Sequence, residues 1–459
     1  MTLRRCLALA VLAGSLQGAF ALLIATIPKA YGTVGQGNMV DDVRLYFDYA
    51  SRTLGGEVPY RDFPVEYPVL ALPFFVAPQL VAPDFETYRW AFALEMLAAN
   101  AAALALVIGC VGRELNGREL TVRLAWYSLT LLALCPMALC RFDLLAMAWT
   151  FAAACAFASG KPRLGGWLAG LGFHVKLIPA VTVVPEVFRP SRPRALGVGS
   201  VVASVLIGFG LWYALAGPAA LRAFSYHLER GNEIGSTWSG VLMGLARMFE
   251  QPLSTAYRHK SLEVDTPWVS VADRIAFPAQ ALALVVVGWR ARRSGRESVL
   301  RFAAASVLAY VVFGKVLSPQ YLLWLIPFVA SMPGRSGTWS RGVFLLACLV
   351  TTALFPLGFH WLLSFRGWAV GLLNYRNALL VGLWLYWTFG REPARASTTE
   401  PPDAALPHRW RRSVAGDDRV GRRPARVEAN LASHVVQSGG GVTSERGLDL
   451  PAPRPFVRP

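Results

Sequence analysis

The sequence reads DDVRLYFDYA at residues 41–50 and GGEVPYRDFPVEYP at residues 55–68. These two runs gather acids, arginines and tyrosines in a chain that otherwise avoids charge. They follow an apolar segment long enough to cross a bilayer and precede a series of further apolar segments. A membrane protein that concentrates acids at the end of its first span usually binds ions or carries out chemistry there. The two runs therefore predict a bundle of membrane spans and the position of its site.

Composition assigns most of the chain to lipid. The 459 residues are 54% hydrophobic and only 16% charged, with a mean hydropathy of +0.42. A soluble protein of this size needs more polar surface. The net charge of +17 does not indicate nucleic-acid binding, because the basic residues form short clusters between apolar runs and near the C-terminus. The positive-inside rule produces this distribution.

The order of apolar and basic segments predicts an all-α fold, a polytopic transmembrane helical bundle of about 10–12 spans. The apolar segments lie at about 6–28, 67–83, 87–111, 122–140, 143–159, 164–187, 195–216, 271–290, 299–316, 320–332, 342–363 and 371–390. The basic clusters lie at 4–5, 113–123, 161–163, 189–194, 290–301, 335–341 and from 391 onward. Placing every cluster in the cytoplasm leaves one consistent arrangement, a multi-pass cell-membrane protein with both termini cytoplasmic.

This arrangement changes how two of the segments are interpreted. The 67–83 segment cannot cross the membrane, because the 113–123 cluster would then face outward. We expect an interfacial or re-entrant helix within the first extracytoplasmic loop, residues 29–86. The 164–187 segment begins and ends inside, so it is predicted to be a hairpin of two short helices that turns near Lys176.

The two ends of the chain differ in character. The basic start and apolar run to about residue 27 resemble a signal sequence, but the length of the run favours an uncleaved first span. Residues 1–390 are predicted to form the transmembrane domain, and residues 391–459 a disordered basic cytoplasmic tail. The six cysteines lie in or beside apolar runs, so we expect small core residues rather than disulfides or metal ligands.

The predicted arrangement places nearly every polar residue outside the basic clusters on the extracytoplasmic face. This face receives residues 29–86, 141–143, 174–176, 218–270, 318–321 and 366–376. The active site is therefore expected on the extracytoplasmic side.

Asp41 and Asp42 are the candidate catalytic residues. An ionised carboxylate just outside a span is partly shielded from water, so its pKa can rise and it can accept a proton from a hydroxyl. General-base catalysis of this kind accelerates a reaction by roughly 10²–10⁴-fold. Adjacent carboxylates point in different directions, so one could face the site while the other orients it or meets solvent. The same pair could instead cap a helix that starts at Val43.

Other polar residues of the first loop each admit two interpretations. Glu66 could take part in the site or could simply favour a helix N-terminus. Arg61 and Asp62 form a plausible local ion pair. The loop tyrosines could belong to an interfacial belt or could stack on sugar rings; they are Tyr46, Tyr49, Tyr60 and Tyr67.

Lys176 is a charged residue inside an apolar hairpin. A charge near the bilayer centre costs at least ~2.5–3.5 kcal/mol on insertion scales, so it needs a partner or a water-filled cavity. A lipid phosphate meets both needs, and a snorkelling lysine paired with Asp143 is the alternative. Asp143 could also pair with Arg141 in the tight turn that they share. Arg366 and Arg376, at the ends of the last outer loop, could clamp a phosphate or mark the membrane interface.

Two further polar runs complete the candidates. Residues 226–233, which include His227, are rich in hydrogen-bonding groups for a loop. Ser318-Pro319-Gln320-Tyr321 opens a span, where Ser-Pro is also an ordinary helix start.

The order of these motifs resembles a known family. Asp42-Val43-x-x-Tyr46 is followed by Gly56-x-x-Pro59-Tyr60-Arg61-Asp62-Phe63-x-x-Glu66-Tyr67-Pro68. Later come the turn aspartate Asp143, the hairpin motif Lys176-x-x-Pro179 and the run Ser318-Pro319-Gln320-Tyr321-Leu322-Leu323-Trp324. Over about residues 6–390 the chain resembles glycosyltransferase family 87 of the GT-C superfamily, which includes actinobacterial mannosyltransferases that use polyprenyl-phosphate mannose.

The resemblance implies a GT-C-like enzyme whose first outer-loop aspartate is the catalytic base. Asp42 matches because the family spacing to Tyr46 starts there, and Asp41 stays possible. Two departures, Val69 in place of a second proline and Arg141-Phe142 before the turn aspartate, bear on the acceptor rather than on the reaction class.

The sequence thus predicts a glycosyltransferase that moves a hexose, with mannose favoured, from a polyprenyl-phosphate donor to an extracytoplasmic acceptor with inversion. The acceptor is a glycolipid or a polysaccharide, and no metal, other cofactor or nucleic acid is required. Lys176, Arg366 and Arg376 would bind the donor phosphate. Substrate-binding residues would be Tyr46, Arg61, Asp62, Glu66, Tyr67, Asp143, His227, Gln320 and Tyr321.

Two other functions remain open. A lipid or sugar transporter or flippase of cell-envelope biogenesis should show two related halves with broken helices in matching positions, and we find none because the acidic loop occurs once. A non-catalytic assembly protein of a cell-envelope pathway is the other alternative.

Overall fold

The computed structural model describes residues 41–112, 115–189, 191–221, 230–258, 261–295 and 298–390. Within these residues the chain is helical, apart from one antiparallel pair of strands, β1 (Ser254–Arg258) and β2 (Ser261–Asp265). The prediction of an all-α polytopic membrane protein is confirmed. The predicted first span at 6–28 and the predicted tail at 391–459 lie outside the described residues.

Four helical stretches in the described residues are long and apolar enough to cross a membrane. They are α5 (Phe85–Val111), α11 (Arg192–Ala216) with part of η3 (Gly217–Leu221), α14 (Val269–Ala291), and α17 (Gly334–Thr352) with η6 (Ala353–Leu357). The predicted segments 87–111, 195–216 and 271–290 agree closely with the first three.

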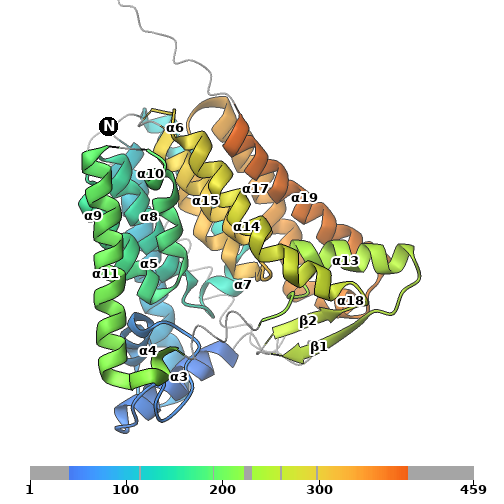
Figure 1. The fold of residues 1–459 in the computed structure, drawn as a ribbon, viewed down its shortest axis with the longest axis horizontal. Helices are drawn as coiled ribbons and strands as arrows, with labels where there is room; N and C mark the ends of the chain where they lie inside the picture. The colour runs from blue at the N-terminus through green and yellow to red at the C-terminus, as the bar shows by residue number, and fades with distance from the viewer. Residues whose placement is uncertain are drawn as a thin grey trace, which may run out of the picture. The chain divides into compact units, whose positions relative to one another are not determined.

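The helices of the bundle fall into two groups in Figure 1. Helices α5, α8 (Asp143–Ala158), α9 (Pro162–Val175) and α11 lie on one side, and α14, α15 (Val299–Phe313), α17 and α19 (Gly367–Phe389) on the other. The groups meet where α8 contacts η5 and α15. The bundle also contains α6 (Gly117–Ala133), α7 (Cys135–Ala138), η5 (Pro319–Leu325) and α16 (Ile326–Ser331).

The chain reverses at Lys176, as predicted for the 164–187 segment. Helix α9 (Pro162–Val175) ends there, the backbone of Lys176 is extended, and η2 (Ile178–Val183) and α10 (Val184–Val187) follow. Pro162 in the first turn of α9 and Pro179 in the first turn of η2 favour these helix starts. The N–H groups of a first turn have no partner inside the helix, so proline, which lacks an N–H, fits there.

The described part of the predicted first loop begins with the amphipathic helix α3 (Asp41–Leu54). It buries Val43, Tyr46, Tyr49 and Ala50, which recur at helical spacing, against α4 and α5. The predicted 67–83 helix is shorter in the structure, where η1 (Val69–Ala71) and α4 (Leu72–Gln79) replace it. At about 1.5 Å per residue these two elements are too short to cross a hydrocarbon core of ~30 Å.

Small residues allow α9 and α11 to pack closely. A Cβ atom on Gly166 would overlap the carbonyl oxygen of Gly197, and one on Gly170 would overlap the hydroxyl of Ser204. Close backbone approach of this kind is common between membrane helices, because the hydrophobic effect does not drive helices together within lipid.

Several of the predicted cytoplasmic arginines donate hydrogen bonds to helix C-termini, and Arg123, Arg189 and Arg341 are buried. Arg123 and Arg341 donate hydrogen bonds to carbonyls at the end of α16, Arg189 to one at the end of α14, and Arg301 to Gly390 after α19. These bonds satisfy carbonyl groups that have no partner inside their own helix. The end of α19 lies at the opposite end of the bundle from α3 and α4 (Figure 1).

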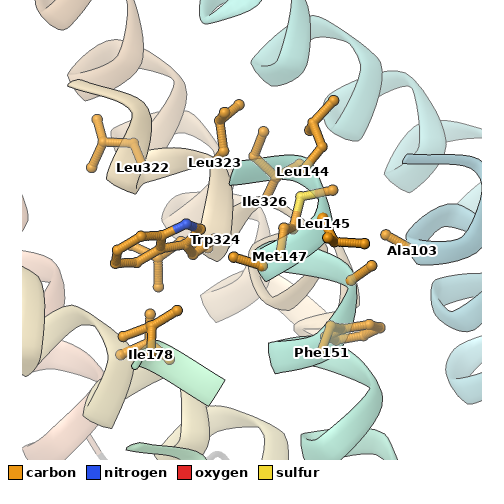
Figure 2. Close-up of a cluster of buried hydrophobic side chains, with 14 of the residues drawn as sticks. Ala103, Leu144, Leu145, Met147, Phe151, Ile178, Leu322, Leu323, Trp324 and Ile326 are labelled. Atoms are coloured by element: carbon orange, nitrogen blue, oxygen red, sulfur yellow. The ribbon is translucent and has the colours of Figure 1, made fainter. Parts of the chain in front are cut away.

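The core between the two groups is apolar. Figure 2 shows side chains from α8, η2, η5 and α16 meeting around Trp324, among them Leu144, Met147, Ile178 and Ile326. Each of these side chains is almost fully buried.

One expectation about the cysteines is wrong. A disulfide joins Cys110 of α5 to Cys155 of α8, which the sequence analysis took for free core thiols. Among the described cysteines, Cys135, Cys140 and Cys348 are free, as expected. The two bonded residues sit on neighbouring helices, and apolar patterning carries no information about that proximity.

Substituting Gly166 with leucine should lower stability by about 1–3 kcal/mol, because the side chain must force the α9 and α11 backbones apart. Gly199→Leu on α11 is the matched control, since nothing lies within 4 Å of a Cβ at that position. The check is the unfolding midpoint of both purified variants in detergent. Equal midpoints would contradict the packing argument.

Candidate active site

A cavity of about 650 Å³ lies where α3 and the β-hairpin approach the bundle. Figure 1 shows that α3, α4, β1, β2, α13 (Thr237–Met248) and α18 (Phe359–Leu363) all lie at one end of the helices. The wall is partly polar and partly apolar. Its charged side chains are Asp42, Glu66, Arg141, Lys176, Arg230, Glu233, Asp273, Lys315 and Arg376.

Asp42 reaches the cavity from the first turn of α3 and forms an ion pair with Arg141. Both side chains are partly exposed, at 24% and 21%. Asp41 is the first residue of α3, and its side chain lies outside the described part of the structure.

Lys176 lies in the wall beside Asp143. Its Nζ is 2.7 Å from Asp143 Oδ1, and the same oxygen accepts a hydrogen bond from Trp324 Nε1 at 2.8 Å. Asp143 is only 1% exposed and does not line the cavity. The pairing considered in the sequence analysis is therefore present, and Lys176 also lines the cavity. Asp143 pairs with Lys176, whereas Arg141 pairs with Asp42.

Positive charge and aromatic rings surround Lys176. The charges of Arg141 and Arg230 both act on its ammonium group. Its Nζ lies 4.4 Å from the ring centre of Phe142 and 5.6 Å from that of Tyr321. Such a cluster suits an anionic group, because cations held in a poorly hydrated site attract anions strongly.

Tyrosines lie at and beneath the cavity wall. Tyr67 lines the cavity, and its hydroxyl is 3.4 Å from that of Tyr46, which is 1% exposed and stacks on Phe75. Burial raises the pKa of both phenols well above the usual value, so both stay neutral hydrogen-bonding groups. Tyr46 therefore supports the wall rather than facing the cavity.

Arg61 and Asp62 lie outside the cavity and pair with each other at 2.9 Å. The Asp62 carboxylate also accepts a hydrogen bond from the Val58 backbone N–H. The Arg61 hydrogen bonds and this backbone N–H lower the pKa of Asp62 to about 2. Asp62 thus closes the turn of the loop as a permanently ionised acceptor.

The other sequence candidates divide in the same way. Glu66, Gln320, Tyr321 and Arg376 line the cavity, whereas Arg366 is an exposed residue at the start of α19 and does not. His227 lies outside the described residues.

The sequence analysis missed Arg230 and Glu233. Glu233 accepts a hydrogen bond from the hydroxyl of Ser318 at 2.7 Å. Both residues belong to the polar run 226–233, but a loop has no periodicity that separates inward from outward side chains. In the described ranges no group of three or more His, Cys, Asp or Glu residues is placed to hold a metal ion.

The family model described as glycosyltransferase family 87 matches residues 65–319, more than half of the chain. The match includes Glu66, Arg141, Lys176 and Glu233 and begins after Asp42.

Two curated proteins are similar to part of the chain. GPI mannosyltransferase 1 of Saccharomyces cerevisiae is 27% identical over 225 residues, covering 44% of this chain and 51% of the relative. GPI mannosyltransferase 1 of Eremothecium gossypii is 23% identical over 218 residues, with the same shares covered. The chain therefore spans about half the length of the curated relatives it matches. Because the family match extends over more than half of its residues, the chain belongs to glycosyltransferase family 87.

Proposed function

We propose that this chain is a membrane glycosyltransferase that moves a hexose, with mannose favoured, from a polyprenyl-phosphate donor to a glycolipid or polysaccharide acceptor. The observation that carries the proposal is that Asp42, Lys176 and Arg230 line one cavity. A base and a cationic site for a leaving phosphate are the two elements that such a transfer needs. Family membership and the names of the two relatives support the same reaction class.

Asp42 is the proposed base. A hydroxyl oxygen of the acceptor attacks the anomeric carbon of the donor sugar and forms the new glycosidic bond. The hydroxyl proton passes to the Asp42 carboxylate, and the bond between the anomeric carbon and the phosphate oxygen breaks with its electron pair on the phosphate. Attack on the face opposite the leaving group inverts the anomeric configuration. Asp41 is the alternative base, since its position in α3 is adjacent.

The leaving phosphate is proposed to bind at Lys176, with Arg230 and Arg141 contributing positive charge. Negative charge grows on the phosphate as the bond breaks, and fixed cations stabilise that charge without reorganising. Arg366 is not part of this proposal because it lies away from the cavity.

An apolar part of the same wall would take the start of the lipid chain. It is formed by Leu354, Phe355, Phe359, Leu362 and Leu373, from η6, α18 and α19. Burying apolar surface contributes roughly 25 cal/mol per Å², so a few isoprene units would add appreciably to donor binding.

The cavity end of the bundle is proposed to face away from the cytoplasm, with both termini cytoplasmic. Arginines gather around the C-terminal ends of α14, α16 and α19, and the end of α19 lies opposite α3. Basic residues favour the cytoplasmic side, so the cavity would open on the other side.

Asp42→Asn should lower mannose transfer by roughly 10²–10⁴-fold, because the amide cannot accept the proton. The measurement is transfer of radiolabelled mannose from polyprenyl-phosphate mannose to membrane acceptors. Asp48→Asn is the matched control, an exposed acid on the same helix that should leave transfer unchanged. Normal transfer by the Asp42 variant would remove this residue as the base, and loss on Asp41→Asn alone would assign the role to Asp41.

Lys176→Met combined with Asp143→Asn should raise the KM for the donor roughly tenfold or more, because the phosphate loses a charged hydrogen-bond donor. The double variant is needed because Lys176→Met alone would leave the buried Asp143 carboxylate without its counter-charge. Lys161→Met, an exposed lysine before α9, serves as the control. An unchanged donor KM in the double variant would place the phosphate elsewhere.

A cysteine at Glu57 should be labelled by a membrane-impermeant maleimide added to intact cells, and one at Lys161 should be labelled only after the cells are opened. Lys161 is exposed and the Glu57 side chain is 43% exposed, and the two residues lie at opposite ends of the proposed arrangement. Labelling is compared with that of the parent chain. The reverse pattern would overturn the proposed orientation.

A further inference from the structure

Glu233 and Arg376 lie in the cavity wall, and each has side-chain atoms without a hydrogen-bond partner in the described part of the chain. Glu233 Oε1 accepts from Ser318 Oγ, but Oε2 is buried and has no hydrogen-bond partner among the described residues. Arg376 is 3% exposed; its Nη2 donates to the carbonyl of Gly235 at 2.7 Å, and its Nε and Nη1 have no partner in the same part of the chain. Buried polar atoms are normally satisfied, so these three are available for hydrogen bonds to a guest in the cavity.

The backbone around Glu233 is held on several sides. Its N–H donates to the carbonyl of Lys315 at 3.0 Å, and the next N–H, of Ile234, donates to Leu262 in β2 at 2.9 Å. Asn377 of α19 donates to the carbonyl of Ser236 at 3.3 Å. The carboxylate is therefore fixed in position, which suits selective recognition.

The two charges together restrict the chemistry of the guest. The negative charge of Glu233 acts on Arg376, yet no ion pair joins the two side chains in the described residues. A phosphate would be attracted by Arg376 but repelled by Glu233, and a cation would meet the opposite conflict. A neutral hydroxyl group can donate to the carboxylate and accept from the guanidinium. Adjacent hydroxyls on a sugar ring fit this arrangement.

Neighbouring residues connect Glu233 and Ser318 to the region of Lys176. Arg230, whose charge acts on Lys176, precedes Glu233 by three residues. Ser318 is also tied to this region, because its carbonyl accepts from the N–H of Tyr321, whose ring lies 5.6 Å from Lys176 Nζ. A subsite so connected to the proposed phosphate position suits the sugar bonded directly to that phosphate.

We propose that Glu233, Ser318 and Arg376 form a subsite that binds hydroxyl groups of the transferred hexose and so selects the donor sugar. Glu233 and Arg376 contact the sugar, and Ser318 orients the Glu233 carboxylate. The proposal rests on the proposed function for the presence of a lipid-phosphate sugar. It assigns Arg376 to the sugar rather than to the phosphate.

The test compares binding of two water-soluble probes, citronellyl phosphate mannose and citronellyl phosphate, to the full chain purified in detergent. The wild-type chain should bind the mannose-bearing probe more tightly. Glu233→Met should weaken that probe roughly 10–100-fold, the effect expected for lost hydrogen bonds to a charged group, and should leave citronellyl phosphate unchanged. Glu233→Gln, which keeps a neutral acceptor, should lose only a few-fold, and Ser318→Ala should change binding in the same direction.

Glu86→Gln is the matched control, because this exposed acid pairs with Arg89 outside the cavity and should alter neither affinity. The proposal is overturned if the wild-type chain binds both probes equally or not at all, or if Glu233→Met weakens both by the same factor. Binding does not depend on the base. Failure of the Asp42 mechanism would therefore appear as normal transfer by Asp42→Asn while the probe affinities stay as predicted.

Discussion

A buried ammonium group must have a partner in an apolar helix bundle, and the Lys176–Asp143 ion pair meets this constraint. The pair joins the break between α9 and η2 to the first residue of α8, and Trp324 adds η5 through its bond to the same carboxylate oxygen. Such a pair gives little net stability compared with apolar packing, since desolvating two charges offsets their attraction. Its distinctive result is that an ammonium group is held at a cavity wall, which is consistent with a role in binding an anion.

Polar groups occupy both ends of the bundle but have different roles at the two ends. Around the ends of α14, α16 and α19, arginines donate hydrogen bonds to carbonyl groups that have no partner inside these helices. Around the cavity, charged side chains pair with one another or, like Glu233 and Arg376, have atoms without a hydrogen-bond partner among the described residues. The first arrangement completes the fold, whereas the second leaves hydrogen-bonding capacity for a ligand. A count of charged residues alone would not separate the two.

Hydropathy was sufficient for most of the fold, because the length and apolarity of α5, α11 and α14 depend only on local sequence. The side-chain partners were harder to predict from the sequence. Arg141 and Asp143 share a turn and invited pairing, but Asp143 begins α8 and points to Lys176, while Arg141 precedes the helix and reaches Asp42 on α3. The disulfide and the contact between Glu233 and Ser318 likewise join positions far apart in the chain. Local patterns cannot specify contacts of that kind.

One local signal could have located the cavity more directly. The backbone departs from regular α-helix at Lys176, Ser318 and Phe355, and all three residues line the cavity. A proline follows each within three residues. Inside lipid, irregular backbone is tolerated only where it is covered by protein or faces a water-filled space, because its N–H and C=O groups need partners. Prolines that interrupt apolar segments beside a polar residue therefore indicate where a cavity can form in such a chain. In this protein all three interruptions lie at the same cavity.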